Sequence, residues 1–230
     1  QTASWLLTVE VGGEARYFTC HFLLMCAGYY NYDAGHQPEF DGRNDFQGRW
    51  VHPQFWPEDL DYKGKKVIVI GSGATAMTLV PSMANDAEKV TMVQRSPTYV
   101  VSRPSVDKVA NFLRKVLPSS WAYGLVRFRN TLWQQIIYNQ TRSNPDRVAQ
   151  NLLGEVEKAV GDVVDVKKHF TPTYNPWDQR LCLVPDDDLF TALRSGKADV
   201  VTDTIAHVDA DGLVTGSGEH IDADIIVSAT

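Results

Sequence analysis

A buried strand that runs directly into a glycine-rich turn and a helix limits this chain to a small set of folds. Residues 67–70 read Val-Ile-Val-Ile, and the turn Gly71–Ala76 follows at once. Apolar residues then recur at helical spacing as far as Met83, and a second apolar strand is expected at Val90–Gln94. This order predicts a βαβ unit with a right-handed crossover, and therefore an α/β protein with a Rossmann-like parallel sheet.

The glycine turn has the small residues that a dinucleotide site needs. Gly71 makes the tight turn, Gly73 lets the backbone approach a pyrophosphate, and Ala76 lets the helix pack closely on the strand. The free N–H groups at the start of the helix attract phosphate oxygens. The turn thus predicts a cofactor-binding set of Gly71, Ser72, Gly73, Ala74, Thr75 and Ala76. A purely structural turn is the alternative, because such turns also occur without ligands.

The residue that follows the second strand decides which nicotinamide nucleotide such a site prefers. A site for NAD carries Asp or Glu there to accept from ribose hydroxyls, whereas this chain has Arg95 after Gln94. A planar guanidinium suits the 2′-phosphate of NADPH, so Arg95 is predicted to bind that phosphate. The alternative is a solvated surface arginine.

Strands are predicted at both ends of the chain, with a long connector between the first pair and the glycine turn. The first pair covers Trp5–Val11 and Arg16–Cys26, and the run Phe22–Cys26 is expected to be buried because all its residues are apolar. Residues 29–58 read as an ordered connector. The last strands are expected at Asp199–Val201, Thr204–Asp209 and Ile225–Val227, with hairpin turns at Asp211-Gly212 and Gly216–Gly218.

Helical patterns interrupt the strand-helix alternation and predict an inserted helical subdomain. They cover residues 107–117, 121–142 and 146–160. Their aromatic side chains are predicted to serve as core and interface rather than to stack on a cofactor. These are Trp121, Tyr123, Phe128, Trp133 and Tyr138. An aromatic, Pro-rich loop is expected at 170–185 and a short helix at 187–195.

Composition narrows the class of protein further. A chain of 230 residues with 43% hydrophobic residues can form one large domain, or one domain with a flank. A net charge of −6 without any Lys/Arg block argues against nucleic-acid binding. No apolar run reaches the ~18 residues of a transmembrane segment, and the start, Gln1–Ser4, does not resemble a signal peptide.

The cysteines and histidines favour a reducing compartment and argue against a metal site. Cys20, Cys26 and Cys182 form no Cys-x-x-Cys pair, so they are predicted to be buried free thiols, which favours a cytoplasmic protein. The histidines other than His52 show no metal-ligand spacing, so no metal is expected.

A second motif precedes the glycine turn. The segment Phe46–Pro57, with Gly48, His52 and Trp56 at fixed positions, resembles the fingerprint of type I Baeyer–Villiger monooxygenases, which are class B flavin-dependent monooxygenases. The resemblance covers nearly the whole chain and is greatest to the ethionamide-activating subgroup. Further similar segments are Gly28–Tyr32, Gly71–Ala76, Gln94–Tyr99 and Asn175–Pro185.

This resemblance implies a particular domain organisation. The family has two dinucleotide-binding domains, but nothing before Gly71 matches its FAD-binding glycine motif, while Cys26–Gly28 and Ser228–Thr230 resemble the two interdomain links. The chain is thus expected to be a fragment: a Rossmann-like NADPH-binding domain with an inserted helical subdomain and flanking strands of an FAD-binding domain. The implied parts are 1–45 (trailing FAD-binding domain and connector), 46–102 (fingerprint linker and NADPH-binding βαβ unit), 103–169 (helical subdomain) and 170–230 (remainder of the NADPH-binding domain to the second link).

The resemblance also implies roles for individual residues. Arg180 matches the family's active-site arginine, which stabilises an anionic intermediate beside the nicotinamide; a salt bridge to Asp178 is the alternative. His52 is implied to couple domain rotation to cofactor position rather than to transfer a proton, and a hydrogen-bonded loop histidine is the alternative. Gln179 stands where several relatives carry a lysine toward the 2′-phosphate, and Ser96 replaces a common threonine but keeps a hydroxyl.

The implied activity is that of a flavoprotein oxidoreductase. NADPH would reduce FAD, and one oxygen of O₂ would be inserted into a ketone or transferred to sulfur or nitrogen, as in a thioether or thioamide. Two alternatives remain: an isolated NADP(H)-binding module without activity, and an N-hydroxylating or reductase flavoprotein. The His52–Trp56 segment and the lack of a Cys-x-x-Cys pair argue against the reductase.

Overall fold

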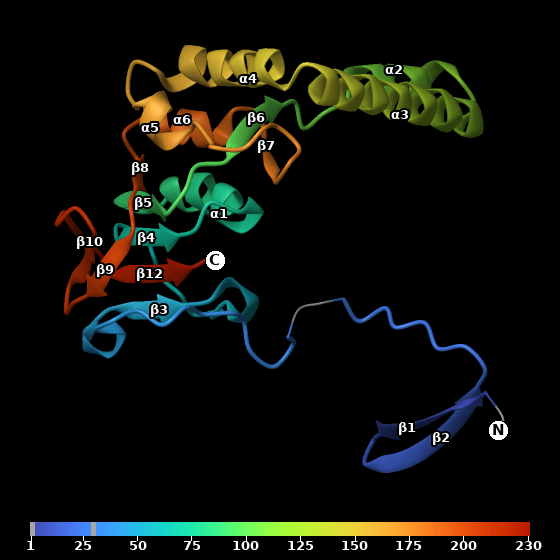
Figure 1. Ribbon diagram of the computed structural model, residues 1–230, viewed down its shortest axis with the longest axis horizontal. Helices are drawn as coiled ribbons and strands as arrows, with labels where there is room; N and C mark the ends of the chain where they lie inside the picture. Colours follow the sequence, from blue (N-terminus) through green and yellow to red (C-terminus); the bar gives the residue numbers. More distant parts are fainter. Residues whose placement is uncertain (1–2, 29–30) are drawn as a thin grey trace. The chain divides into compact units, whose positions relative to one another are not determined.

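The computed structural model of the protein describes residues 3–28 and 31–230, which divide between His36 and Gln37 into two compact units (Figure 1). Tyr29 and Tyr30, two of the residues that carry the Gly28–Tyr32 resemblance, lie outside the described residues, as do Gln1 and Thr2.

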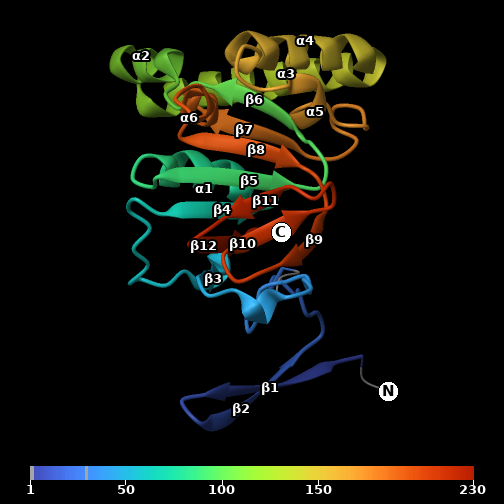
Figure 2. The ribbon, with the colours of Figure 1, turned by 90° about the vertical axis from the view of Figure 1, so that its left-hand side faces the viewer.

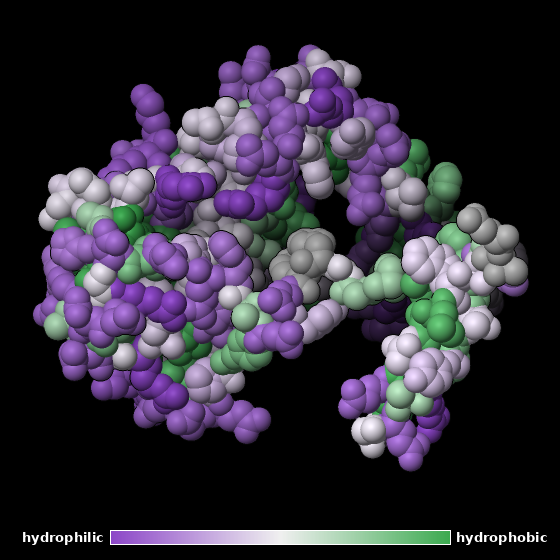
Figure 3. Space-filling model, turned by 60° about the horizontal axis from the view of Figure 1, so that its bottom comes forward, coloured by the Kyte–Doolittle hydropathy of each residue, from purple (hydrophilic) through white to green (hydrophobic). Residues whose placement is uncertain are grey.

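The first unit is an antiparallel hairpin. Strands β1 (Trp5–Val11) and β2 (Glu14–Cys20) pair in register from Trp5 opposite Cys20 to Val11 opposite Glu14. The prediction that the second strand continues as a buried run to Cys26 is wrong: residues 21–26 form no strand, and the Phe22 side chain is 78% exposed. A two-stranded ribbon has no further layer that could bury an apolar face. Apolar side chains therefore lie at the surface of this unit (Figure 3).

The three cysteines are free thiols, as predicted, but only one of them is buried. Cys182 is buried, Cys20 is half-buried and Cys26 is exposed. The prediction of burial was wrong for Cys26 because it rested on the apolar run, which does not enter a core in this structure.

The second unit is built on a parallel sheet of five strands in the order β3-β12-β4-β5-β8 (Figure 2). The predicted strand, turn, helix and strand are confirmed as β4 (Lys66–Ile70), α1 (Ala74–Ala84) and β5 (Lys89–Gln94). The other strands are β3 (Arg49–Val51), β8 (Ala198–Thr202) and β12 (Ile225–Ser228). The α/β class with a parallel sheet is therefore confirmed. The sequence reading missed β3, a strand of three residues within the expected connector.

Both faces of the sheet are buried, as expected for parallel strands that read as continuous apolar runs. Val67 and Val69 of β4 pack with α1 and α6 (Asp188–Arg194). Ile68 and Ile70 point to the opposite face, which is covered by an antiparallel meander. Its strands are β9 (Ile205–Val208), β10 (Gly212–Thr215) and β11 (His220–Asp222), joined by turns at the two positions that the sequence predicts.

The predicted helical insertion is present, although its aromatic side chains are not core. The helices are α2 (Lys108–Val116), α3 (Ser119–Ser143), α4 (Pro145–Val160) and the short α5 (Val166–His169), and α2 to α4 lie at one end of the second unit (Figures 1 and 2). All five aromatic residues that were expected to be core or interface lie on α3 and are exposed. The prediction of core packing was wrong because α3 contacts its neighbours along a narrow strip that includes the buried Ala122 and Thr141.

A small parallel pair of strands supports the insertion. β6 (Tyr99–Arg103) enters it and pairs with β7 (Leu181–Pro185), which leaves it. The sequence reading placed residues 181–185 in a loop because the partner of β7 lies about 80 residues earlier in the chain. This pairing is important for the site because it brings Arg180, the residue before β7, back to the end of β5.

Candidate functional site

The glycine turn lies at the point where the order of the sheet reverses. From β4 the chain passes through α1 to β5 on one side, whereas β12 on the other side of β4 is reached through the meander on the opposite face. In parallel α/β sheets the crevice outside the carboxyl ends of the strands at this point is the usual ligand site. Gly71 follows the carboxyl end of β4 directly, between the ends of β5 and β12.

The two glycines of the turn have different environments. The Gly71 backbone has a φ of +131°, its N–H donates to the Val93 carbonyl (2.8 Å), and a Cβ there would lie 2.4 Å from the Ala229 carbonyl oxygen. Gly71 therefore closes the turn against β12. Gly73 is the N-cap of α1 and has no atom within 4 Å of an added Cβ, so the space in front of the helix is open. Ala76 is fully buried against the sheet, as predicted.

Ser72 connects the turn to two other predicted site residues. Its hydroxyl donates to the Ser96 carbonyl oxygen (3.1 Å) and accepts from the Arg180 guanidinium (2.6 Å between Nη2 and Oγ). The structure therefore brings together the glycine turn, the segment after β5 and the segment before β7. Ala74 and Thr75 are exposed at the start of α1, with their N–H groups facing the same edge of the sheet.

The backbone of Arg180 is held by a polar pair that the sequence reading missed. The Tyr174 hydroxyl donates to the Arg180 carbonyl oxygen (3.0 Å), and the buried Thr98 hydroxyl lies 2.9 Å from the Tyr174 hydroxyl. Thr98 lies within the segment Gln94–Tyr99 that resembles the monooxygenase family, and Tyr174 directly precedes the segment Asn175–Pro185, but neither residue was assigned a role from the sequence.

The alternative role of Arg180, a salt bridge to Asp178, is not what the structure shows. Asp178 pairs with Arg142 of α3 (2.5 Å between Oδ1 and Nη1). Among the ion pairs of the described residues, none involves the Arg180 guanidinium, so its positive charge is available to a ligand at the glycine turn.

The other predicted phosphate-binding residues lie at the same edge. Arg95 and Ser96 are exposed immediately after β5, and no ion pair of Arg95 is found within the described ranges. Gln179 is exposed next to Arg180, without a hydrogen bond to the glycine turn from the part of the chain that the structure describes. The carboxyl edge thus presents two unneutralised guanidinium groups.

A buried polar network fixes the end of β5 below Arg95. The Gln94 amide donates to the His169 carbonyl oxygen (2.7 Å) and to the Thr202 hydroxyl (2.9 Å), which also contacts His169 Nδ1 (2.8 Å). Burial lowers the pKa of His169, so its ring is neutral and acts as a hydrogen-bonding group rather than as a charge. Burial also raises the pKa of the Cys182 thiol, which excludes a thiolate nucleophile beside Ser72 at neutral pH.

His52 follows β3, two strands from β4, which places it about 10 Å from the glycine turn by the usual strand spacing. Its Nδ1 accepts from the Gln54 N–H (3.2 Å) and so caps the short 3₁₀ helix Pro53–Phe55. The half-buried ring is therefore a hydrogen-bonded loop histidine, and the structure brings it to the same edge of the sheet as the turn.

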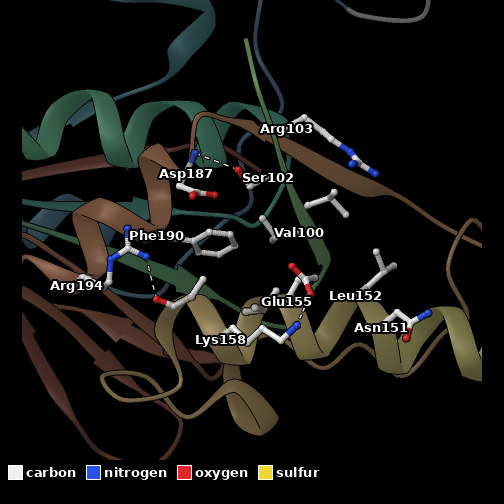
Figure 4. A pocket seen from close by; sticks show the side chains of 13 residues that line it. Val100, Ser102, Arg103, Asn151, Leu152, Glu155, Lys158, Asp187, Phe190 and Arg194 are labelled. Carbon is white, nitrogen blue, oxygen red and sulfur yellow. Dashed lines mark hydrogen bonds and ion pairs between the residues drawn. The ribbon is translucent and has the colours of Figure 1, made fainter. Parts of the chain in front are cut away.

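A separate hollow of about 520 Å³ lies between β6, α4 and α6 (Figure 4). Two of the cations that line it have partners: Lys158 binds Glu155 (2.7 Å), and Arg194 donates to the Ala159 carbonyl oxygen (2.9 Å). The hollow lies away from the glycine turn and contains none of the predicted cofactor-binding residues. The apolar residues that line this hollow include Val100, Val156 and Phe190.

The meander brings together three potential metal ligands that the sequence reading did not connect. One ligand atom each from Asp209, Asp211 and His220 lies within 4.8 Å of the others. His220 Nδ1 contacts Asp222 on its other side (3.2 Å). The three side chains lie at the surface of the meander. The ion pairs of His220 with the two aspartates explain why their ligand atoms are close together.

Comparisons with known proteins place this geometry in a family. Residues 1–135 match the family described as Flavin-binding monooxygenase-like. The chain is 50% identical to the FAD-containing monooxygenase EthA of Mycobacterium tuberculosis H37Rv and 52% identical to the probable FAD-binding monooxygenase AlmA of Acinetobacter baylyi, in both cases over 98% of this chain and 46% of the relative. It is 53% identical to the putative FAD-containing monooxygenase MymA of M. tuberculosis over 96% of this chain and 45% of that protein. The chain thus spans about half the length of these relatives.

Solved structures show the same fold at low sequence identity. OTEMO in complex with FAD and NADP is 21% identical, with a TM-score of 0.71 over 98% of this chain and 50% of that one. An oxidized steroid monooxygenase bound to NADP is 22% identical, with a TM-score of 0.68 over 94% of this chain and 48% of that one.

Proposed function

Because the chain belongs to the flavin-binding monooxygenase-like family, we propose that it supplies the NADPH-binding part of an FAD-dependent monooxygenase. Residues 46–102 and 170–230 form the nucleotide-binding domain, residues 103–169 form its helical insertion, and residues 1–45 belong with the FAD-binding domain. The alternative activities are an isolated NADP(H)-binding module and an N-hydroxylating flavoprotein.

The observation that carries this proposal is the approach of Arg180 to Ser72 of the glycine turn, at the point where the sheet reverses. The residues present fit a phosphorylated dinucleotide. Gly73 leaves open space at the start of an 11-residue helix, and Arg95 stands where an NAD site would carry an acid.

Each residue has a distinct role in this proposal. The N–H groups at the start of α1 and the Ser72 hydroxyl bind the pyrophosphate, while Arg95 and the Ser96 hydroxyl bind the 2′-phosphate. Gln179, which is neutral, adds at most a hydrogen bond there. Arg180 places a permanent positive charge beside the nicotinamide end. When bound, NADPH supplies the hydride that reduces FAD, and the flavin then activates O₂.

We propose a ketone, or a sulfur or nitrogen centre such as a thioether or thioamide, as the substrate, and a cytoplasmic location for the enzyme. His52, at the same edge of the sheet, is proposed to couple movements of the Phe46–Pro57 segment to the position of the nucleotide. These assignments rest on the motifs of this chain and on its similarity to the FAD-containing monooxygenases.

Arg95→Ala is expected to raise the Kd for NADPH about 10- to 150-fold, because a charged hydrogen bond to the 2′-phosphate contributes about 1.5–3 kcal/mol. The Kd for NADH should not change, since NADH has no 2′-phosphate. Calorimetric titration of both nucleotides measures the effect, and Arg147→Ala, an exposed arginine on α4, is the control. Equal affinity of the unmodified chain for NADPH and NADH would contradict the role of Arg95.

The purified 230-residue chain is expected to be colourless and to take up no FAD, because its sequence contains one dinucleotide-type glycine turn. NADPH at 100 times its Kd should still stabilise the chain by about 2.7 kcal/mol, which corresponds to a rise in Tm of about 5–10 °C. Absorbance at flavin wavelengths and thermal melts test both points. A yellow protein with one bound flavin would show that the domain boundaries are misplaced.

A further inference from the structure

One side of α3 carries an exposed apolar stripe. Residues at intervals of three or four along the helix lie on one side and are exposed; Trp121 is 68% and Phe128 67% exposed. With the rise of an α-helix, about 1.5 Å per residue, the stripe is about 22 Å long from Trp121 to Ile136. Its members are Trp121, Leu125, Phe128, Leu132 and Ile136.

Helix α2, which packs along α3, has a similar exposed side. Val109, Phe112 and Val116 recur at helical spacing and are at least half exposed, and Lys108 and Lys115 flank them on the same helix. No ion pair of either lysine is found in the chain from residue 31 onward. α2 is thus a basic amphipathic helix with its apolar side uncovered.

The charge of this part of the protein is opposite to that of the whole. Residues 103–143 carry seven of the 22 Lys and Arg residues but one of the 28 acidic residues, so the segment has a net charge of +6 in a chain of net charge −6. Cations next to exposed Trp, Phe and Leu side chains are the features of helices that lie in the interface of an anionic bilayer.

We propose that the α2–α3 face docks on an anionic membrane surface. The apolar stripe enters the boundary between headgroups and acyl chains, while the cations of this face that have no ion pair among the described residues, such as Lys108 and Lys115, contact the lipid phosphates. This docking would be peripheral: we find no helix among the described residues whose length and apolarity would suffice to cross a bilayer.

Two other partners fit the same face less well. A second copy of the chain would bring two predominantly basic segments together, which like-charge repulsion opposes. A nucleic acid would use the cations and aromatic rings but would leave Leu125, Leu132 and Ile136 exposed to water. The membrane is the partner that uses both the charge and the aliphatic side chains, and this inference does not depend on the proposed enzymatic function.

The test is flotation of the 230-residue chain with vesicles of phosphatidylcholine containing about one third phosphatidylserine, and with vesicles of pure phosphatidylcholine. We expect binding to the anionic vesicles that falls about tenfold on pure phosphatidylcholine and in ~0.5 M NaCl. Trp121→Ser with Phe128→Ser, and separately Lys108→Glu with Lys115→Glu, should each reduce binding about tenfold.

Matched control variants distinguish docking through the α2–α3 face from non-specific adsorption through exposed side chains elsewhere on the protein. Phe18→Ser with Phe22→Ser removes two apolar side chains that are similarly exposed on the first unit (55% and 78%), and Lys63→Glu with Lys65→Glu reverses two exposed charges outside the face. Both pairs should bind vesicles like the unmodified chain, and circular dichroism verifies that all variants are folded. Equal binding to neutral vesicles, equal loss in the control pairs, or a dimer that the Trp121→Ser with Phe128→Ser change dissociates would overturn the proposal.

Discussion

An Arg180→Ala variant of the complete enzyme is expected to consume NADPH while forming almost no oxygenated product. The loss should be about 100-fold or more, the usual effect of removing a group that stabilises developing negative charge. The NADPH and O₂ consumed should appear as NADP⁺ and hydrogen peroxide. Because Asp178 is paired with Arg142, no described carboxylate neutralises Arg180 before the ligand arrives.

The position of Arg180 beside Ser72 also allows a different outcome, which the same variant distinguishes. If the guanidinium binds the pyrophosphate instead, Arg180→Ala will weaken NADPH binding and slow flavin reduction, and the product will still match the NADPH consumed. Rapid-mixing kinetics with a ketone and with a thioamide measure both steps. Arg180→Lys retains the charge without the planar fork and should recover part of the product, whereas Arg147→Ala should behave like the unmodified enzyme.

The sequence was sufficient to predict those elements whose structure depends only on residues close together in the chain. The run 67–70 is apolar throughout because both faces of β4 are buried, and the steric demands on Gly71 and Ala76 are met within the same βαβ unit. The βαβ unit can therefore be predicted from the 29 consecutive residues Lys66–Gln94, without knowledge of the rest of the fold.

The parts that the sequence did not predict depend on distant partners. Leu181–Pro185 is a strand because Tyr99–Arg103 lies beside it, and the contact of Arg180 with Ser72 joins residues 108 positions apart. The prediction that Phe22 is buried was wrong for the same reason. Phe22 is apolar, but the hairpin before it offers no second layer for it to pack against. Periodicity predicts which residues could be buried, but tertiary contacts decide which of them are.

Gly71→Ala is expected to destabilise the chain and to abolish NADPH binding together. The added Cβ would lie 2.4 Å from the Ala229 carbonyl oxygen, and a φ of +131° is unfavourable for any residue with a side chain. Strain and overpacking of this kind cost about 3 kcal/mol, and a protein of this size should lose about 10 °C in Tm.

Gly73→Ala separates the structural role of the turn from its role in binding, because the two glycines differ in their surroundings. An alanine is compatible with the extended backbone of Gly73, and its Cβ meets no protein atom within 4 Å. The Tm without nucleotide should therefore stay close to that of the unmodified chain. The same methyl group would project into the space that we assign to the pyrophosphate, so the Kd for NADPH should rise about tenfold or more. If the Gly73→Ala variant binds NADPH with unchanged affinity, the pyrophosphate does not occupy the open space before α1, and its assignment to this site is wrong.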